Sequence, residues 1–159
     1  MKYAALLLIG LLIAGCGATR YQRIGSEGGY DDQCITDTNC LVWFRGNSQT
    51  PSERAMFYSL YRCAELTLER GFDYFVVESS IEDLQKSEYH VPAEYKTTTT
   101  TEGNKTETKT SFSPARVETV EKPLARIRIS MFKGEKPADA KEAYSAREVM
   151  RNLEPRIER

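Results

Sequence analysis

The side chains that could do covalent or acid–base chemistry in this chain are four cysteines and a single histidine. Cys16 closes an apolar N-terminal run, whereas Cys34, Cys40 and Cys63 stand in the polar-apolar mixture that follows it, and His90 comes later. A thiolate can be alkylated, oxidised or bound to a metal, and a histidine can act as a general base. Which of these reactions applies depends on the segments that hold the five side chains.

The first 15 residues have the composition of an export signal. Lys2 supplies a positive charge, and residues 4–13 consist of Ala, Leu, Ile and Gly without interruption. This is the layout of a secretory n-region followed by an h-region. The run is too short to span a bilayer, which takes about 20 residues. We therefore expect residues 1–15 to be a cleaved signal peptide.

Residues 12–16 read L-I-A-G-C and resemble the bacterial lipobox. In proteins with this motif the cysteine sulfur receives a diacylglycerol, and the peptide bond before the cysteine is cut. The small Ala14 and Gly15 would admit a peptidase, and only a thiolate is nucleophilic enough to be alkylated. The resemblance implies that Cys16 is the lipidated N-terminus. The alternative is an ordinary cleaved signal in which Cys16 is incidental.

The residue after Cys16 indicates in which membrane a lipoprotein of this kind is located. In lipoproteins of this kind an Asp there signals retention in the inner membrane, and this chain has Gly17 instead. The resemblance therefore implies an outer-membrane protein. The chain has 22 Lys and Arg against 23 Asp and Glu, so it offers no basic excess for nucleic acid, and we expect none as a partner. Membrane contact should come from the acyl chains.

The rest of the chain divides into a linker and one domain. Residues 17–29 are glycine-rich and aperiodic, so residues 16–29 are expected to be the lipidated Cys16 and a flexible tether. Residues 30–159 suit a single domain. Within it, residues 51–70 predict an amphipathic helix with Cys63 on its apolar side. The opposite side is expected to face solvent and carries Tyr58, Arg62, Glu65 and Glu69.

Hydrophobic patterning predicts the class of this domain. Two apolar segments around T-D-T-N indicate a hairpin, and strict alternation near the C-terminus indicates a half-buried strand. We expect an α+β fold in ββαββα order, with a single small, mostly antiparallel sheet and both helices on one face. The expected strands are residues 30–35, 40–45, 73–78 and 125–132. A second helix is expected to begin at a capping box of Asp139 and Glu142 and to end at Pro155.

A threonine-rich insertion at about 94–113 interrupts the domain. Folding it about its Gly-Asn dipeptide places Glu102 opposite Lys105, Tyr95 opposite Phe112, and threonine opposite threonine. Such cross-strand matches are favourable by about 0.2–1 kcal/mol each. We expect a β-hairpin that protrudes into solvent, because neither of its faces is apolar. A disordered low-complexity linker is the alternative.

The remaining cysteines favour a structural role. If Ile35 and Asn39 close the first hairpin, Cys34 and Cys40 are direct cross-strand partners within disulfide range, and an exported protein meets oxidising conditions. Cys63 is expected to be a buried, unreactive thiol. The C-x5-C spacing lacks the paired arrangement of a zinc site. We therefore predict a Cys34–Cys40 disulfide and no metal or other cofactor.

No catalytic constellation stands out. His90, before a proline, is expected to be an exposed loop residue, and nothing supports it as a base for Cys63 or a serine. Asp31 and Asp32 should point to opposite faces of their strand. Nucleotide-binding and zinc-protease motifs are missing from the sequence. We expect that the protein is not an enzyme.

Three stretches resemble a group of small proteobacterial lipoproteins of uncharacterised function. They are F-R-G-N-S-Q-T (44–50), Y-R-C-A-E-L-T-L-E-R-G-F-D-Y-F-V-V (61–77) and the C-terminal A-R-E-V-M-R-N-L-E-P. The resemblance covers most of the folded part, except the insertion and the Cys34/Cys40 pair. It implies an address and a fold, and beyond Cys16 it assigns no functional residue.

Two hypotheses for function follow. In the first, the protein is a non-enzymatic outer-membrane lipoprotein that faces the periplasm and binds another envelope protein through the hairpin or an exposed sheet face. In the second, it binds a glycan, a lipid or a peptidoglycan fragment. Trp43, Arg45 and Asn47 would then be the residues of interest, and convergent polar groups in a pocket would favour this hypothesis.

Overall fold

A five-stranded antiparallel sheet is the base of the protein in the computed structural model, which describes residues 17–134 and 143–159. The predicted signal peptide, residues 1–15, the predicted lipidation site Cys16 and the predicted capping box of Asp139 and Glu142 lie outside the described residues. The strands lie side by side in the order β1-β2-β6-β3-β7. They are β1 (Gly29–Cys34), β2 (Asn39–Arg45), β3 (Tyr74–Val91), β6 (Arg116–Phe132) and β7 (Ala143–Ser145).

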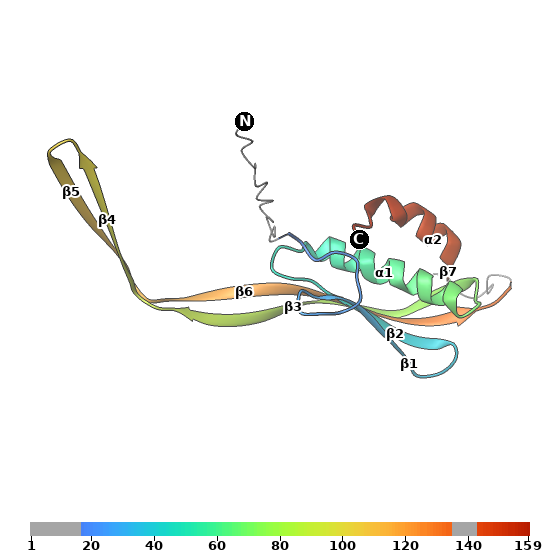
Figure 1. The fold of residues 1–159 in the computed structure, drawn as a ribbon. Helices are drawn as coiled ribbons and strands as arrows, with labels where there is room; N and C mark the ends of the chain where they lie inside the picture. The colour runs from blue at the N-terminus through green and yellow to red at the C-terminus, as the bar shows by residue number, and fades with distance from the viewer. Residues whose placement is uncertain (1–16, 135–142) are drawn as a thin grey trace, which may run out of the picture.

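Two helices lie on the same side of this sheet (Figure 1). Helix α1 (Ser52–Glu69) packs on the sheet, and α2 (Ala146–Leu153) packs on α1 and is followed by the short 3-10 helix η1 (Glu154–Arg156). The predicted α+β class, with a mostly antiparallel sheet and two helices, is confirmed. The predicted order, ββαββα with a hairpin insertion, is incomplete, because it lacks the short strand β7 that precedes α2.

The core lies between the sheet and α1. Alternate residues of the central strands point toward the helix, so that Phe44, Ile127 and Ile129 are at most 1% exposed. Helix α1 contributes both small and large side chains to this core, including the fully buried Cys63 and Tyr58. Burying each large apolar side chain contributes about 1.5–3 kcal/mol. The sheet and α1 therefore form the stable body of the molecule.

The N-terminal residues of the described chain are part of this body. Thr19 and Tyr21 are only 3% and 6% exposed, and Arg23 forms an isolated bridge with Tyr30. The prediction of a flexible tether over residues 17–29 is therefore wrong for most of that segment. The aromatic ring of Tyr21 is the physical reason, because it stacks on Tyr30 at 4.6 Å and covers the side of α1 that was expected to face solvent.

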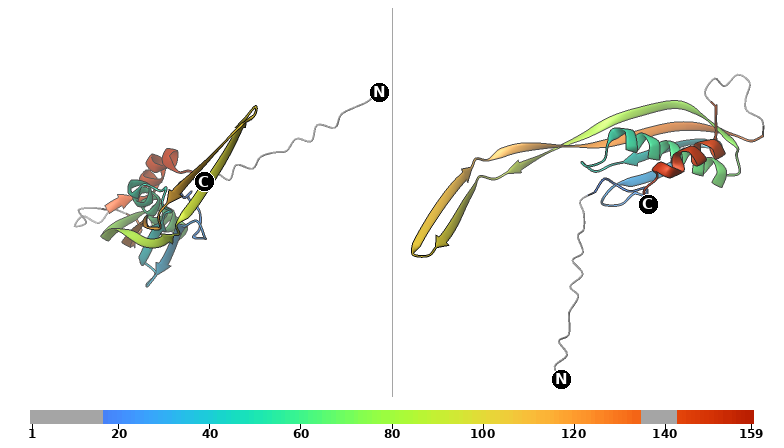
Figure 2. Two further views of the ribbon diagram at one scale, coloured as in Figure 1. Left: turned by 90° about the vertical axis from the view of Figure 1, so that its left-hand side faces the viewer. Right: turned by 90° about the horizontal axis from the view of Figure 1, so that it is seen from above.

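Strands β3 and β6 continue far beyond the sheet. Strand β2 pairs with β6 only as far as Arg45 and Leu124, and from there on β3 and β6 pair only with each other. Strands β4 (Glu94–Glu102) and β5 (Lys105–Ser113) then extend this ribbon to a tip. Residues 84–123, which we call the arm, project away from the body in all three views (Figures 1 and 2).

The arm consists of two ribbons joined at a bend. Pro92-Ala93 and Pro114-Ala115 separate β3 from β4 and β5 from β6 at the same level of the arm. Proline cannot donate to a strand ladder, so both strands are interrupted there together. Each ribbon has about nine residue pairs at roughly 3.3 Å per residue, which makes the arm about 60 Å long.

The outer ribbon has the pairing that the sequence predicts. Glu102 pairs with Lys105, Tyr95 pairs with Phe112, and three threonine pairs lie between them. Gly103 has a φ of +59°, which suits a glycine in the turn. The hairpin differs from expectation in its setting, because it is carried on the long β3–β6 ribbon instead of leaving the sheet directly.

Candidate interaction surfaces

The cysteines of the described chain have structural roles. Cys34 and Cys40 are cross-strand partners in β1 and β2 and form a disulfide. Cys63 is fully buried in α1, and burial raises the pKa of its thiol well above the ordinary value. A neutral, inaccessible thiol is a poor nucleophile. Among residues 17–134 and 143–159, therefore, no cysteine is available for catalysis.

His90 belongs to the exposed arm of the structure and is far from the buried Cys63 of the body. It lies on β3 opposite Val117 and is exposed, so the expectation that it sits in a loop is wrong. The reason is the long-range pairing with β6, which carries β3 past Tyr89. Because His90 belongs to the arm and Cys63 to the core of the body, the structure does not bring the two together.

The side of α1 expected to face solvent holds a buried arginine. Arg62 is 4% exposed and donates hydrogen bonds to Asp32 at 2.9 Å, Glu69 at 2.7 Å and Glu65 at 3.1 Å. Its guanidinium also lies 5.0 Å from the centre of the Tyr30 ring. Arg62 and Glu65 are therefore not a solvated surface pair, as the spacing in α1 suggested, but part of a network that ties α1 to β1.

This network holds its charges in place. Burial by itself would lower the pKa of Arg62, but the hydrogen bonds to Glu69, Asp32 and Glu65 outweigh it and raise that pKa. The hydroxyl of Tyr21 donates to Glu65 as well, and burial together with this carboxylate raises the pKa of Tyr21. The polar groups of the network are satisfied by other residues of the body. We therefore interpret the network as a structural link between α1 and β1 and not as a ligand site.

The arm exposes an unusual amount of apolar surface. Of the eight large hydrophobic side chains that are exposed in the described part of the chain, five belong to the arm. Isolated surface hydrophobics are common in monomeric proteins, but a cluster of them marks an interaction site. Tyr95 and Phe112 form such a cluster near the bend, with ring centres 4.7 Å apart and 72% and 55% exposure. The other three are Leu84, Tyr89 and Val117.

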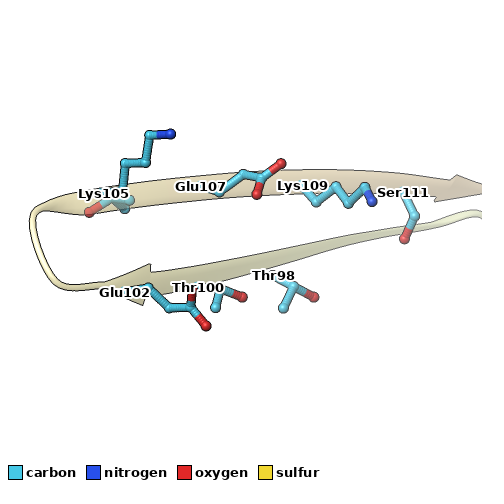
Figure 3. A pocket seen from close by; sticks show the side chains of 8 residues that line it. Thr98, Thr100, Glu102, Lys105, Glu107, Lys109 and Ser111 are labelled. Carbon is cyan, nitrogen blue, oxygen red and sulfur yellow. The ribbon is translucent and has the colours of Figure 1, made fainter.

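The other side of the hairpin carries a polar hollow. Thr98, Thr100, Glu107 and Lys109 line it, with Glu102 and Lys105 next to the turn (Figure 3). Every residue of β4 and β5 is exposed, so this hollow is a shallow strip along a two-stranded ribbon and has no enclosing walls. A small-molecule site normally surrounds most of its ligand. The hollow is therefore better suited to an extended partner surface.

The sheet face opposite the helices is a second open surface. Because Val42 and Phe44 point toward α1, Trp43 points away from it. In the strand register Trp43 pairs with Arg126, and Arg45 lies two residues further along β2 on the same face. Arginine and tryptophan are enriched at energetically important positions of protein interfaces.

Asn47, the third residue considered for ligand binding, has a different position. Its side chain donates to the Gly17 carbonyl at 2.8 Å and accepts from the Thr50 hydroxyl at 2.8 Å. Asn47 is thus occupied in holding the start of the described chain. The structure places Trp43 and Arg45 on one face and leaves Asn47 out of it.

The described residues lack two further features. Within residues 17–134 and 143–159, no group of three or more His, Cys, Asp or Glu side chains could hold a metal ion. In the same part of the chain no helix has the length and hydrophobicity needed to cross a bilayer.

Comparison of the chain with protein-family models, with curated proteins and with solved structures gave no match. The resemblance to small proteobacterial lipoproteins, together with the lipidation of Cys16, therefore stays a prediction.

Proposed function

We propose that this protein is a non-enzymatic outer-membrane lipoprotein, anchored through Cys16 and facing the periplasm, that binds another envelope protein through its arm. The observation that carries the proposal is the arm itself. Residues 84–123 form a ribbon about 60 Å long that contributes no buried side chain to the core apart from Pro123 at its base. Such an extension has no role in the stability of the body, so we assign it to binding.

The charge of the arm favours a protein as the partner. Residues 84–123 contain six acidic and six basic side chains, interspersed along both ribbons. This balance creates no field that would attract nucleic acid or an anionic membrane. Apolar and aromatic side chains between the charges are typical of a protein-binding surface. The neutral arm therefore supports a protein partner over a polyanion.

The strand edges of the arm offer a mode of binding. Beyond the sheet each strand of the arm pairs on one side only, so both outer edges carry unpaired backbone N–H and C=O groups. An extended segment of a partner can add to such an edge, with side-chain pockets supplying the specificity. The lysines and glutamates along these edges also discourage unspecific edge-to-edge aggregation.

Site-specific photo-crosslinking in cells tests the proposal. A photoreactive amino acid is placed in turn at each position from 96 to 110, and adducts are identified by mass spectrometry. We expect one envelope protein to be captured at several neighbouring positions of the arm. A photoreactive residue at the exposed Arg147 of α2 is the matched control and should not capture that protein. If no position from 96 to 110 captures a protein, the proposal is rejected.

A further inference from the structure

We infer that no flexible linker separates the lipid anchor from the body, so that the loop of residues 47–50 rests against the lipid headgroups. We call this loop the exit loop, because the chain leaves the described body beside it. The inference rests on the proposed anchoring of Cys16. According to this inference, the domain is held at the bilayer surface and is not suspended from the membrane by a flexible tether.

Thr19 is the first firm point of attachment. It is 3% exposed, and its backbone N–H donates to the Thr50 hydroxyl at 2.9 Å. The Thr19 hydroxyl accepts from the backbone N–H of Asn47 and donates to the Glu27 carbonyl, both at 2.8 Å. Three hydrogen bonds to two different loops thus fix a residue that lies only three positions after Cys16.

The attachment to the body also includes Gly17, which lies closer to the anchor than Thr19. The side-chain amide of Asn47 donates to the Gly17 carbonyl at 2.8 Å, and Gly17 is bonded directly to Cys16. Consecutive Cα atoms are about 3.8 Å apart. An acylated Cys16 places its glycerol at headgroup level, so the side-chain amide of Asn47 lies within roughly 15 Å of the headgroups.

Tyr21 prevents residues 17–21 from detaching from the body. Its ring packs among Tyr30, Tyr58 and Tyr61, and its backbone N–H donates to the Glu158 carbonyl at 2.7 Å. Removing a buried aromatic side chain from such a setting is strongly unfavourable, and Tyr21 is only 6% exposed. The segment therefore stays in place while the acyl chains hold the bilayer.

The same loop connects the anchor to the base of the arm. Gly46, which precedes the exit loop, donates its N–H to the Pro123 carbonyl at 2.8 Å. A Cβ at Gly46 would lie 2.8 Å from Pro123 and 2.6 Å from Thr50, so only glycine allows this contact. The two ribbon figures agree that the described chain starts at the end of the body from which the arm projects (Figures 1 and 2). The base of the arm is therefore held near the bilayer.

Depth-sensitive fluorescence quenching tests this arrangement. The lipidated full-length protein is reconstituted into phosphatidylcholine vesicles that contain a headgroup-spin-labelled lipid. A fluorophore is attached to Gln49→Cys in the exit loop or to Lys133→Cys at the opposite end of the sheet; both positions are exposed. The buried Cys63 and the disulfide-bonded Cys34 and Cys40 should not take up label. A third variant carries Gln49→Cys and about twelve Gly and Ser residues inserted after Gly17, with a reach of roughly 20 Å.

We expect quenching at position 49 to be at least about threefold stronger than at position 133, and the insertion to abolish this difference. Equal quenching at the two positions, or a difference that the insertion leaves unchanged, overturns the inference while the anchoring stands. Flotation of the vesicles separates this from the other failure. If the protein does not float with them, the anchoring of Cys16 is wrong, and the inference is rejected with it.

Discussion

Strands β3 and β6 run through both the body and the arm, and the two regions use the same strand pair differently. In the body, β6 lies between β2 and β3 beneath α1, and Ile127 and Ile129 are at most 1% exposed. In the arm, no third strand and no helix from the described part of the chain covers these two strands, and Leu84, Tyr89 and Val117 are 42–52% exposed. The body therefore accounts for the stability, and the arm is left available for a partner.

Charge is distributed differently in the two regions as well. In the body, the buried Arg62 forms ion pairs with Asp32, Glu65 and Glu69. In the arm the pair of Lys86 and Glu121 is 2.9 Å apart but widely exposed. Exposed ion pairs contribute about 0–1 kcal/mol, whereas breaking a buried one is costly. The comparison predicts that substitutions in the body lower the free energy of unfolding more than substitutions in the arm.

The largest effect is expected at the centre of the body network. Arg62→Met would leave Asp32, Glu65 and Glu69 without their shared cation, and we expect it to lower the free energy of unfolding by about 3 kcal/mol. Chemical denaturation measures this value. Arg147→Met, on the exposed side of α2, is the matched control and should change it by no more than about 0.5 kcal/mol. Equal effects of the two substitutions would show that the network does not stabilise the body.

The disulfide should have the next largest effect. Replacing both Cys34 and Cys40 by serine removes a short loop closure in the unfolded chain, and the expected loss is about 2 kcal/mol in the chain-entropy model. Denaturation of the oxidised protein and of the double variant gives the difference. Reductant should destabilise the original protein by the same amount and leave the variant unaffected. A variant as stable as the oxidised protein would contradict the prediction.

Alkaline pH should weaken the body through its buried tyrosines. Burial and the hydrogen bond to Glu154 raise the pKa of Tyr61 to about 12, against an ordinary value of 10.0. A raised pKa means that its stabilising contribution is complete below pH 10 and is lost as the pH rises toward 12. We therefore expect the free energy of unfolding to fall over this range, and Tyr61→Phe to reduce that fall. An identical pH dependence in the two proteins would rule out Tyr61 as a cause.

The smallest effect is expected at the arm. Replacing residues 92–115 by a two-residue Asn-Gly turn joins Val91 to Arg116, which are cross-strand partners. Because every residue of β4 and β5 is exposed, the free energy of unfolding should change by no more than about 0.5 kcal/mol. A large loss of stability would mean that the outer ribbon supports the fold, and the division into body and arm would then be wrong.

The outer ribbon and the disulfide could be predicted because their partners are close in the sequence. The register of β4 and β5 follows from matching Glu102 with Lys105 across the turn. Cys34 and Cys40 face each other across a four-residue connection. In both cases the pairing is decided by side chains that a short turn brings together, and these side chains can be read directly from the local pattern.

The buried network and the length of the arm could not be predicted in this way. Arg62 is buried because Asp32, thirty positions earlier, and the ring of Tyr30 cover it. Within α1 alone its position looks like a solvent-facing one. The extension of β3 past residue 78 likewise depends on pairing with β6, and residues 79–91 show no clear alternation of their own. The burial of Tyr21 could not be predicted either, because the glycines on both sides of it are typical of a linker.

Hydrogen exchange in native membranes tests the central claim, that the arm is the partner-binding region, most directly. Amide exchange is compared between the protein in isolated outer membranes and the purified lipidated protein in vesicles. We predict that amides of residues 84–123 exchange at least about tenfold more slowly in the native membranes, whereas amides of β2 exchange equally in both. Exchange of the arm at the same rate in both preparations would contradict the claim.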